Sequence, residues 1–598
     1  MRTIYRLALT PLFLAAQLAL SSPAWADSVG PYFLPLPQQE EAVPKLVLDA
    51  AGLGNVFAGK TLLQLPYPKD SELDAMRENN ARGSAGQAKA LQIGFARDIP
   101  ADSRLATSEL AWVGLPDGRL AAQFSVVSPG AKAMRLGLMI KDGFSGELRF
   151  AGSGKPEQVF GPYRREDWLG QAVYWSPLSD GEMVTVEIVL PAGQKNLNGD
   201  IEVVQVSHIV THPTQGNQFA NLVPTTASCE IDMECSTNSV VKDAAKGVAR
   251  MLFVEGGKSY VCSGTLLNDK SSSQTPWFYT ANHCISTQAT ASTLNTFFFY
   301  ENSGCYSSNV AKTYKQLTRG ATYLDSSVTN DHAFLRLNDA APGGVTFNAW
   351  NTEALVSSQT VVGIHHPHGD FKKVSSGSVG SPAMANIRSL DTGEVLNNLW
   401  QVTFSSGTTE SGSSGSGLFY CTSSQCELRG GLFGGPAASG QECVDRRNSY
   451  SRFDVAYARI SSYLNTAATP TCTSPQILQN GQCVTPTPTC TSPQVLQNGQ
   501  CVTPTPTCTS PQVLQNGRCV TPAPTCTSPQ VLQNGQCVTP TPTALPGATY
   551  SSSNGALTIK RLEVDAGVFG KTYYDVTMKM QANSNPPTLT VDTAVLSK

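Results

Sequence analysis

Three short stretches of the sequence bring together residue types that can perform nucleophilic chemistry. His283 lies in Thr-Ala-Asn-His-Cys, Asp331 in Asn-Asp-His-Ala-Phe-Leu, and Ser414 in Gly-Ser-Ser-Gly-Ser. A serine hydroxyl is a poor nucleophile at neutral pH unless an imidazole takes its proton and a carboxylate holds that imidazole in the right tautomer. We therefore expect His283 to act as general base, Asp331 to orient it and Ser414 to attack.

The order of these residues and their flanks favour one architecture. The order His–Asp–Ser is that of chymotrypsin-like enzymes, whereas α/β-hydrolases and subtilisins use other orders. Cys284 follows the histidine, and the stretch beginning at Cys262 reads as its strand partner. Asp331 opens the apolar run 333–337. An aspartate in a solvent-exposed turn is the alternative, but its place between the other two motifs favours catalysis.

The serine motif also predicts an oxyanion hole. Gly412 and Gly415 permit a tight turn, so the N–H groups of Gly412 and Ser414 can point at a developing negative charge. A Gly/Ser-rich run is often a linker, but this one leads into an apolar strand. Ser413 and Ser416 are rival nucleophiles, and the register Gly-x-Ser-Gly selects Ser414. In chymotrypsin-type zymogens an aspartate precedes the nucleophile; Ser413 stands there, so that ion pair is unavailable.

Composition excludes several other functions. The net charge is −3 and only 15% of the 598 residues are charged, which argues against nucleic acid or an anionic membrane as partner. The histidines of His365-His366-Pro367-His368 fit no common zinc spacing. We expect no metal and no cofactor.

The N-terminus reads as a signal peptide over residues 1–26. Two arginines precede the apolar run 7–20, and Ala24-Trp25-Ala26 is a small-x-small cleavage signature. A membrane anchor is the alternative, but the run is short and Pro11 interrupts it. We therefore expect an exported protein that does not span a membrane.

Cysteine usage divides the rest of the chain. None of the 16 cysteines precedes Cys229, and in an exported chain they predict disulfides. Residues 27–227 are predicted to be a pro-region: residues 27–100 are only weakly patterned, and residues from about 103 to 210 alternate like β-strands and predict a β-sandwich-like part. Residues 228–466 hold the three motifs and suit a double β-barrel peptidase domain. The whole chain is predicted to be dominated by β-structure.

Beyond residue 466 the composition changes twice. Residues 467–543 repeat a Cys/Pro/Thr-rich unit with a period of 18, and the cysteines pair within units as 472/483, 490/501, 508/519 and 526/537. Thr-Pro spacers favour extended polyproline II, so we predict a semi-rigid stalk. A carbohydrate-binding repeat is the alternative, but it lacks aromatic side chains. Residues 544–598 predict a small β-module, which could contact a cell surface or matrix.

Several of these stretches resemble the lysyl endopeptidases that Gram-negative bacteria secrete, a trypsin-fold family. The resemblance rests on residues 91–97, 228–235, 364–367, 409–416 and 432–436 and spans roughly residues 90–463. It implies peptidase activity on protein or peptide substrates and export through the periplasm. It also implies three disulfides, Cys229–Cys443, Cys235–Cys305 and Cys262–Cys284, and leaves Cys421 and Cys426 as an extra pair.

The resemblance also points to a specificity pocket and to a departure within it. Phe433, Gly434 and Gly435 match the family's pocket-lining stretch. Asn448 stands where lysine-specific members carry an aspartate, and a buried lysine without a counter-charge is costly. Asp445 is a substitute that the sequence cannot place.

The sequence therefore predicts a secreted serine endopeptidase that is made as a preproenzyme and works through an acyl-enzyme. The rival is a non-catalytic secreted adhesin or binding protein on a peptidase scaffold. Such a protein would be free to lose one of the three catalytic residues, and all three are present.

Overall fold

The computed structural model describes residues 26–465 apart from 38–43, 52–60, 84–89, 105–109, 195–199, 212–225, 390–392 and 437–439, and beyond 465 only short strand segments. The chain divides into two compact units, residues 1–471 with 478–482, and the remainder. The predicted signal peptide before residue 26, residues 212–225 near the expected end of the pro-region and four of the repeat cysteines (472, 490, 508 and 526) lie outside the described residues.

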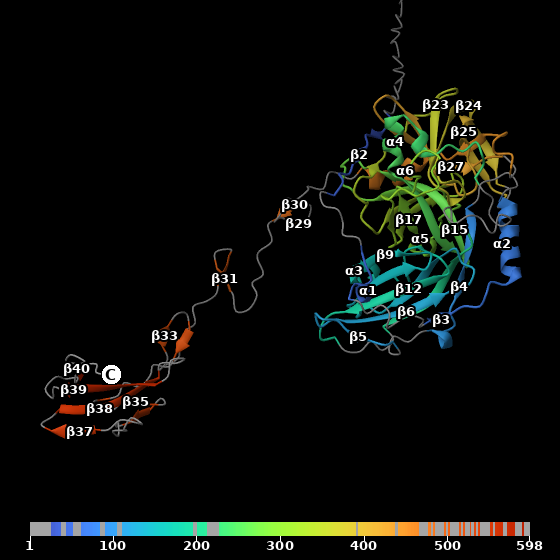
Figure 1. Ribbon diagram of the computed structural model, residues 1–598. Helices are drawn as coiled ribbons and strands as arrows, with labels where there is room; N and C mark the ends of the chain where they lie inside the picture. Colours follow the sequence, from blue (N-terminus) through green and yellow to red (C-terminus); the bar gives the residue numbers. More distant parts are fainter. Residues whose placement is uncertain are drawn as a thin grey trace, which may run out of the picture. The chain divides into compact units, whose positions relative to one another are not determined.

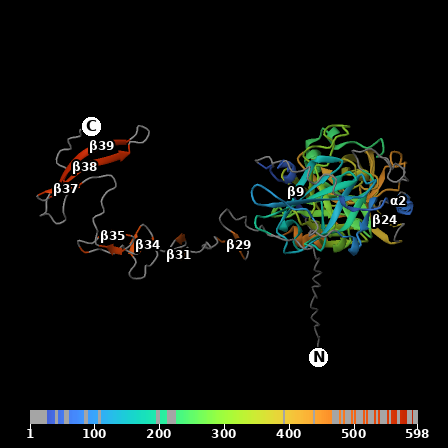
Figure 2. The ribbon, with the colours of Figure 1, turned by 60° about the horizontal axis from the view of Figure 1, so that its bottom comes forward.

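The first part of unit 1 is a pair of facing sheets, as the alternation in the sequence predicts. One is a six-stranded sheet of order β3-β6-β12-β8-β9 with β5 beside β6. Its inward side chains, such as Phe124, Phe150 and Val186, share a buried core with Leu136 and Val206 from the opposite sheet. Figure 1 shows these strands in blue to teal at the lower end of unit 1, and Figure 2 shows β9 and α2 on opposite sides of it. The six strands are β3 (Thr61–Gln64), β5 (Val113–Gly114), β6 (Leu120–Val127), β8 (Glu147–Gly152), β9 (Lys155–Tyr163) and β12 (Met183–Leu190).

The opposite sheet has twelve strands and continues past the boundary expected at residues 227/228. Its main path is β10-β7-β13-β4-β15-β14-β17-β18, so β4 pairs directly with β15. Its strands are β4 (Leu91–Asp98), β7 (Ala133–Ile140), β10 (Tyr174–Trp175), β11 (Ser179–Asp180), β13 (Ile201–Ile209), β14 (Val248–Glu255), β15 (Lys258–Leu267), β16 (Trp277–Thr280), β17 (Asn295–Phe298), β18 (Lys315–Leu317), β19 (Ala321–Ser327) and β20 (His332–Leu337).

A buried arginine strengthens this connection between the two parts of unit 1. Arg135 is fully buried on β7 and donates to the carbonyl oxygens of Leu252 (3.4 Å) and Thr293 (3.0 Å). Its guanidinium also lies 4.8 Å from the ring centre of Trp175. Because buried charge needs partners, these contacts fix the predicted pro-region against the strands that follow it.

An eight-stranded sheet of order β1-β22-β27-β26-β23-β24-β25-β28 completes unit 1. Its first strand belongs to an N-terminal arm, residues 27–37, which pairs with strands from residues 346–351. The strands of this sheet are β1 (Ser28–Val29), β22 (Ala349–Asn351), β23 (Thr360–His365), β24 (Lys373–Arg388), β25 (Val395–Ser406), β26 (Gly417–Cys421), β27 (Cys426–Gly434) and β28 (Arg447–Tyr450); β2 (Tyr32–Phe33) pairs separately with β21 (Thr346–Phe347).

Helices are short and peripheral. The longest are α2 (Asp70–Gly83) and α6 (Phe453–Leu464), the latter at the end of the expected peptidase domain. The others are α1 (Val47–Ala50), α3 (Arg165–Trp168), α4 (Ser239–Ala245) and α5 (Gln288–Ser292), with 3₁₀ turns at Ala101–Ser103, Met233–Cys235 and Pro367–Gly369. Within the described part of the chain, no helix is long and apolar enough to cross a membrane. The fold is thus dominated by strands, as predicted.

Beyond residue 471 the described elements are strands, and the residues of the first repeat hairpin, β29 with β30, are divided between the two units. Four two-stranded hairpins occupy the repeats, and an antiparallel sheet of order β37-β38-β39-β40 lies in the C-terminal module. The hairpin strands are β29 (Ile477–Gln479), β30 (Gln482–Val484), β31 (Val495–Gln497), β32 (Gln500–Val502), β33 (Val513–Gln515), β34 (Arg518–Val520), β35 (Val531–Gln533) and β36 (Gln536–Val538). The module contains β37 (Tyr550–Ser553), β38 (Ala556–Asp565), β39 (Lys571–Met580) and β40 (Leu589–Thr590).

Candidate active site

His283 and Asp331 meet because two neighbouring antiparallel strands end together. β16 pairs with β20 in a register that sets Thr280 opposite Ala333. His283 comes three residues after the last residue of β16, and Asp331 directly precedes the first residue of β20. Antiparallel pairing therefore places both residues at the same end of the strand pair.

The contact between these two residues is short and bidentate. His283 Nδ1 lies 2.8 Å from Asp331 Oδ2, and the backbone N–H of His283 donates to Oδ1 at 3.0 Å. The aspartate side chain is only 4% exposed and the histidine side chain 19%. Asp331 has a φ of +50°, an uncommon conformation for this residue type, which turns its carboxylate toward the imidazole. An ionised carboxylate only accepts hydrogen bonds, so Nδ1 carries the proton and Nε2 is free to act as a base.

Ser414 lies on a turn between β25 and β26 that packs against the histidine turn. Ser263 of β15 connects them, because its N–H donates to Ser414 O at 2.8 Å and its carbonyl accepts from Thr280 Oγ1 at 2.9 Å. A Cβ placed on Gly415 would come within 2.1 Å of Thr280 Oγ1. Only glycine permits this close approach, which brings the serine turn against the strand that leads to His283.

The side-chain atoms that would react, Ser414 Oγ and His283 Nε2, are buried. Neither Ser414 Oγ nor His283 Nε2 hydrogen-bonds to any residue that the structure describes. Catalytic hydrogen bonds are often long in the absence of substrate and shorten in the complex. The structure thus places the three predicted residues in one region, with the histidine–aspartate hydrogen bond formed and the serine–histidine hydrogen bond not formed.

The rival serines differ in their partners. Ser413 Oγ lies 2.8 Å from Nδ1 of His365 and accepts the Glu410 N–H at 3.3 Å, so its hydroxyl is occupied. Ser416 Oγ is buried without a hydrogen bond to any described residue, as Ser414 Oγ is. Geometry thus separates Ser413 from the candidate nucleophile, while the choice between Ser414 and Ser416 rests on sequence register.

The predicted oxyanion hole is a glycine turn with free amides. Gly412 has a φ of +92°, and a Cβ there would lie 3.0 Å from His368 N. Its carbonyl points away from the hole and accepts from Ser263 Oγ at 3.1 Å. Among the described residues, the N–H groups of Gly412 and Ser414 have no backbone acceptor. Both amides therefore remain available to a ligand oxygen.

The three histidines after β23 do not gather around one point. His365 bonds Ser413 and Ser375, and His366 Nδ1 lies 3.0 Å from Asp370 O. Nδ1 of His368 instead lies 3.8 Å from Glu410. Burial lowers the pKa of His365 to about 3 and that of His366 well below its usual value, so both imidazoles are neutral.

The candidate specificity residues cluster near β28. Asn448 is 3% exposed, accepts from Thr409 Oγ1 at 2.5 Å and donates from Nδ2 to Arg446 O at 3.1 Å. A Cβ on Gly435 would lie 2.8 Å from Asn448 Oδ1, so the Gly434–Gly435 backbone passes directly beside this amide. The Phe433 ring lies edge-to-face against the His283 ring, with 6.0 Å between the ring centres.

Asp445, the substitute acid considered from the sequence, has a different partner. It forms a two-point ion pair with Arg447 at 2.8 and 2.7 Å, and this arginine pair lowers the pKa of Asp445 below its usual value. Its charge is therefore already balanced within the protein.

All four disulfides expected within residues 228–466 are present. They are Cys229–Cys443, Cys235–Cys305, Cys262–Cys284 and Cys421–Cys426. In the repeats, Cys519 and Cys537 are disulfide-bonded, and the other cysteines of their two units lie outside the described residues.

Two supporting features were missed by sequence reasoning. Ser263 hydrogen-bonds to the carbonyl oxygens of Gly412 and Ser414 and accepts the His366 N–H. In the sequence it was recognised only as part of the strand that carries Cys262. Glu410 is buried, although a glutamate in a Ser/Gly-rich stretch is expected at the surface. The only signal was its position four residues before Ser414.

This arrangement of strands and side chains defines a serine peptidase. Comparison with known proteins narrows the class. A family model described as "Lysyl endopeptidase, C-terminal domain" matches residues 223–451, and one described as "Lysyl endopeptidase N-terminal domain" matches residues 64–210. A lysyl endopeptidase of Pseudomonas aeruginosa is 34% identical over 368 residues, which are 59% of this chain and 77% of that protein. The chain belongs to the lysyl endopeptidase family.

Two solved structures are more distant. The active form of the Rv3671c protease from M. tuberculosis is 14% identical and covers 41% of this chain and 91% of its own, with a TM-score of 0.28. The HtrA-type protease AlgW with tripeptide is 16% identical and covers 38% and 64%, with a TM-score of 0.27.

Proposed function

We propose that this protein is a secreted serine endopeptidase that uses His283, Asp331 and Ser414 as its catalytic triad. The observation that carries the proposal is the pair of hydrogen bonds from His283 to Asp331, which leaves Nε2 as the basic nitrogen. The Ser414 turn packs against the strand leading to that histidine. Peptide bonds of proteins are the substrate class.

The reaction proceeds in two stages. His283 takes the proton of Ser414 Oγ as the oxygen attacks the peptide carbonyl, and the amides of Gly412 and Ser414 stabilise the oxyanion. The tetrahedral intermediate collapses as His283 gives the proton to the leaving amine, which forms an acyl-enzyme. Water then repeats the sequence and releases the acid. Asp331 stabilises the imidazolium throughout and does not itself take the proton.

Synthesis as a preproenzyme fits the organisation of the chain. Residues 1–26 are the proposed signal, residues 27–227 the pro-region, and the disulfide-rich part begins at Cys229. The repeats and the C-terminal module extend the peptidase as a stalk that could hold it at a cell surface. Asn448 in the pocket implies a weaker lysine preference than in lysine-specific relatives.

The test is Ser414→Ala in the full chain, with Ser416→Ala, two residues further along, as its matched control. We expect Ser414→Ala to lose peptidase activity and labelling by a fluorophosphonate probe, while Ser416→Ala keeps both. Residual rate over background must be measured, because binding and the oxyanion hole alone still accelerate the reaction. Activity that survives in Ser414→Ala and disappears in Ser416→Ala would move the nucleophile. An unlabelled, inactive wild type would favour a binding protein on this scaffold.

A further inference from the structure

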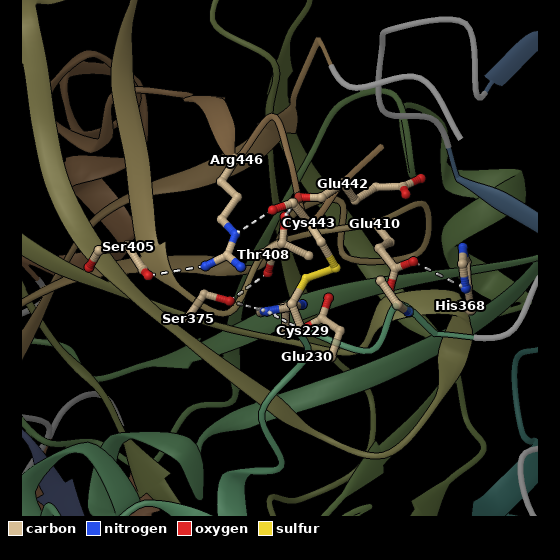
Figure 3. The surroundings of a disulfide bond; sticks show 12 residues. Cys229, Glu230, His368, Ser375, Ser405, Thr408, Glu410, Glu442, Cys443 and Arg446 are labelled. Atoms are coloured by element: carbon tan, nitrogen blue, oxygen red, sulfur yellow. Dashed lines mark hydrogen bonds and ion pairs between the residues drawn. A yellow bond between two sulfur atoms is a disulfide. The ribbon is translucent and has the colours of Figure 1, made fainter. Parts of the chain in front are cut away.

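A half-buried disulfide lies against the segment that leads into the oxyanion turn, defined here as residues 411–414. The lead-in segment is residues 408–410. In Figure 3 the Cys229–Cys443 disulfide is drawn between Thr408 on one side and Glu410 on the other. Its Cα atoms are 5.7 Å apart, and it joins chain positions separated by 214 residues.

Residues close to each half of this disulfide hold the lead-in segment. Two residues before Cys229, the N–H of Ala227 donates to Glu410 Oε2 at 3.0 Å. One residue before Cys443, the carbonyl of Glu442 accepts from Thr408 Oγ1 at 2.8 Å. The disulfide therefore closes a ring of contacts around the lead-in segment.

Glu410 passes this restraint on to the oxyanion turn. Its carbonyl accepts the Ser413 N–H at 3.0 Å, and its own N–H donates to Ser413 Oγ at 3.3 Å. The next carbonyl, that of Ser411, accepts the His368 N–H at 2.7 Å. Gly412 and Ser414, whose amides form the oxyanion hole, lie within the stretch that these bonds fix.

The environment of Glu410 is costly for a carboxylate. Its side chain is 3% exposed, and His368 Nδ1 is 3.8 Å away. Burial, with Glu442 and Asp370 nearby, raises the pKa of Glu410 to about 7 despite the Ala227 hydrogen bond. Burial and the neighbouring Glu410 raise the pKa of Glu230 well above its usual value. Because such a group reduces stability when it ionises, the carboxylate of Glu410 is not explained by a contribution to stability at neutral pH.

We propose that Glu410 is a positioning residue for the oxyanion turn, and that residues 226–230, fixed by the Cys229–Cys443 disulfide, brace the turn through it. The inference rests on the proposed function, with the pro-region cleaved before residue 227, inside the range 224–228 in which the mature chain is expected to begin, so that the active enzyme keeps Ala227. Ser413 occupies the position at which related zymogens use an aspartate, and its hydroxyl is bonded to His365. The order of the turn comes instead from the segment at the start of the peptidase domain.

Two substitutions break the brace from opposite ends. Glu410→Ala removes the acceptor, and Ala227→Pro removes the donor N–H without touching the turn. Glu410→Gln keeps an oxygen that can accept the Ala227 N–H and serves as the rescue. Glu234→Gln, four residues beyond the bracing segment and paired with Lys242 near the surface, is the matched control.

We expect Glu410→Ala and Ala227→Pro each to lower kcat by about tenfold or more, since loss of an entire oxyanion donor costs about 10²–10³. KM and the affinity for a product-like peptide should not change, whereas a peptide boronate, whose adduct places an oxygen in the hole, should bind more weakly by a similar factor. The double variant should lose no more than either single one. Glu410→Gln and Glu234→Gln should keep kcat.

Unchanged kcat in Glu410→Ala, or equal weakening of boronate and product peptide, would overturn the proposal. If Glu410→Ala does not fold, the comparison of Glu410→Gln with Ala227→Pro decides it, because only the second breaks the hydrogen bond. The proposed function fails separately: an active Ser414→Ala would refute it whatever Glu410 does.

Discussion

The exchange Asn448→Asp tests the proposed pocket most directly. Asn448 is buried on β28 and uses both ends of its amide, with Oδ1 accepting from Thr409 and Nδ2 donating to Arg446 O. An aspartate would keep the first hydrogen bond, lose the second and set a carboxylate oxygen against the Arg446 carbonyl. It would also add the negative charge that a lysine ammonium needs.

These terms give the size of the effect. An uncompensated buried charge costs about 3–5 kcal/mol, and a lost hydrogen bond about 1 kcal/mol. The difference means that Asn448→Asp should stabilise the transition state of a lysine substrate by about 2–4 kcal/mol more than the wild type does. At 1.36 kcal/mol per factor of ten, this is a rise in kcat/KM for lysine of about 30-fold to 1,000-fold. The empty pocket bears the opposite cost, so Asn448→Asp should unfold more easily in the absence of substrate.

The assay uses peptides that differ only in the residue before the scissile bond, with lysine, arginine, glutamine and methionine compared by kcat/KM. Asp445→Asn is the control, because Asp445 is already paired with Arg447 and its loss should not alter the ranking. A wild type that prefers lysine by about 100-fold or more, or an Asp445→Asn variant that loses lysine cleavage, would refute the reasoning. So would an Asn448→Asp variant whose lysine rate does not rise selectively.

Three further outcomes follow from the same structure. Asp331→Asn should lower kcat by about 10³–10⁴, because one amide oxygen cannot accept both the Nδ1–H and the backbone N–H of His283; steady-state kinetics with unchanged KM would bear this out, and a loss of less than tenfold would contradict it. Glu410→Gln should gain stability relative to wild type by about 2–3 kcal/mol as the pH is raised from 5 to 8. The raised pKa of Glu410 in the wild type gives a stabilising contribution that is present below the unfolded pKa of the group and is lost as the pH rises through about 7. The titratable groups that face Glu410 are Glu230, Glu442, Asp370 and His368. Denaturant titration at both pH values checks this, and a constant difference would show that Glu410 does not titrate there. N-terminal sequencing of the secreted active enzyme should begin near residues 224–228, whereas a fully active species that retains residue 30 would count against removal of the pro-region.

The candidate site was predictable where local sequence carries it. The histidine, aspartate and serine each sit in a short motif whose flanks state the local geometry, and the strand pair β16–β20 brings two of them together. The pairing of cysteines followed from a family resemblance. The alternating stretches between about 103 and 210 indicate strands, because a period of two reports directly on one buried face, whereas β3 and β4 before residue 100 had no such signal.

Other features depend on partners that a pattern does not name. Residues 91–98 are only weakly patterned, and nothing in them indicates that they form a strand whose edge pairs with β15, more than 150 residues later in the chain. Likewise a glutamate gives no sign that it is buried against the Ala227 amide, since that contact spans 183 residues. Long-range pairing and the burial of charge are properties of the assembled fold.

The N-terminal arm has a consequence for how this protein acquires its structure. Asp27 exchanges backbone and side-chain hydrogen bonds with Thr352, and its carboxylate contacts Lys270 and the hydroxyl of Tyr457 on the last helix of unit 1. Asp27 therefore cannot contact Thr352 until more than 300 further residues have been made. Contacts of such high sequence separation slow folding, so the arm can bind only after the strands and the helix that it contacts have folded. Closure of the arm on β22 and α6 then marks the completion of unit 1, so protection of the Ser28 and Val29 amides from hydrogen exchange would time that final event.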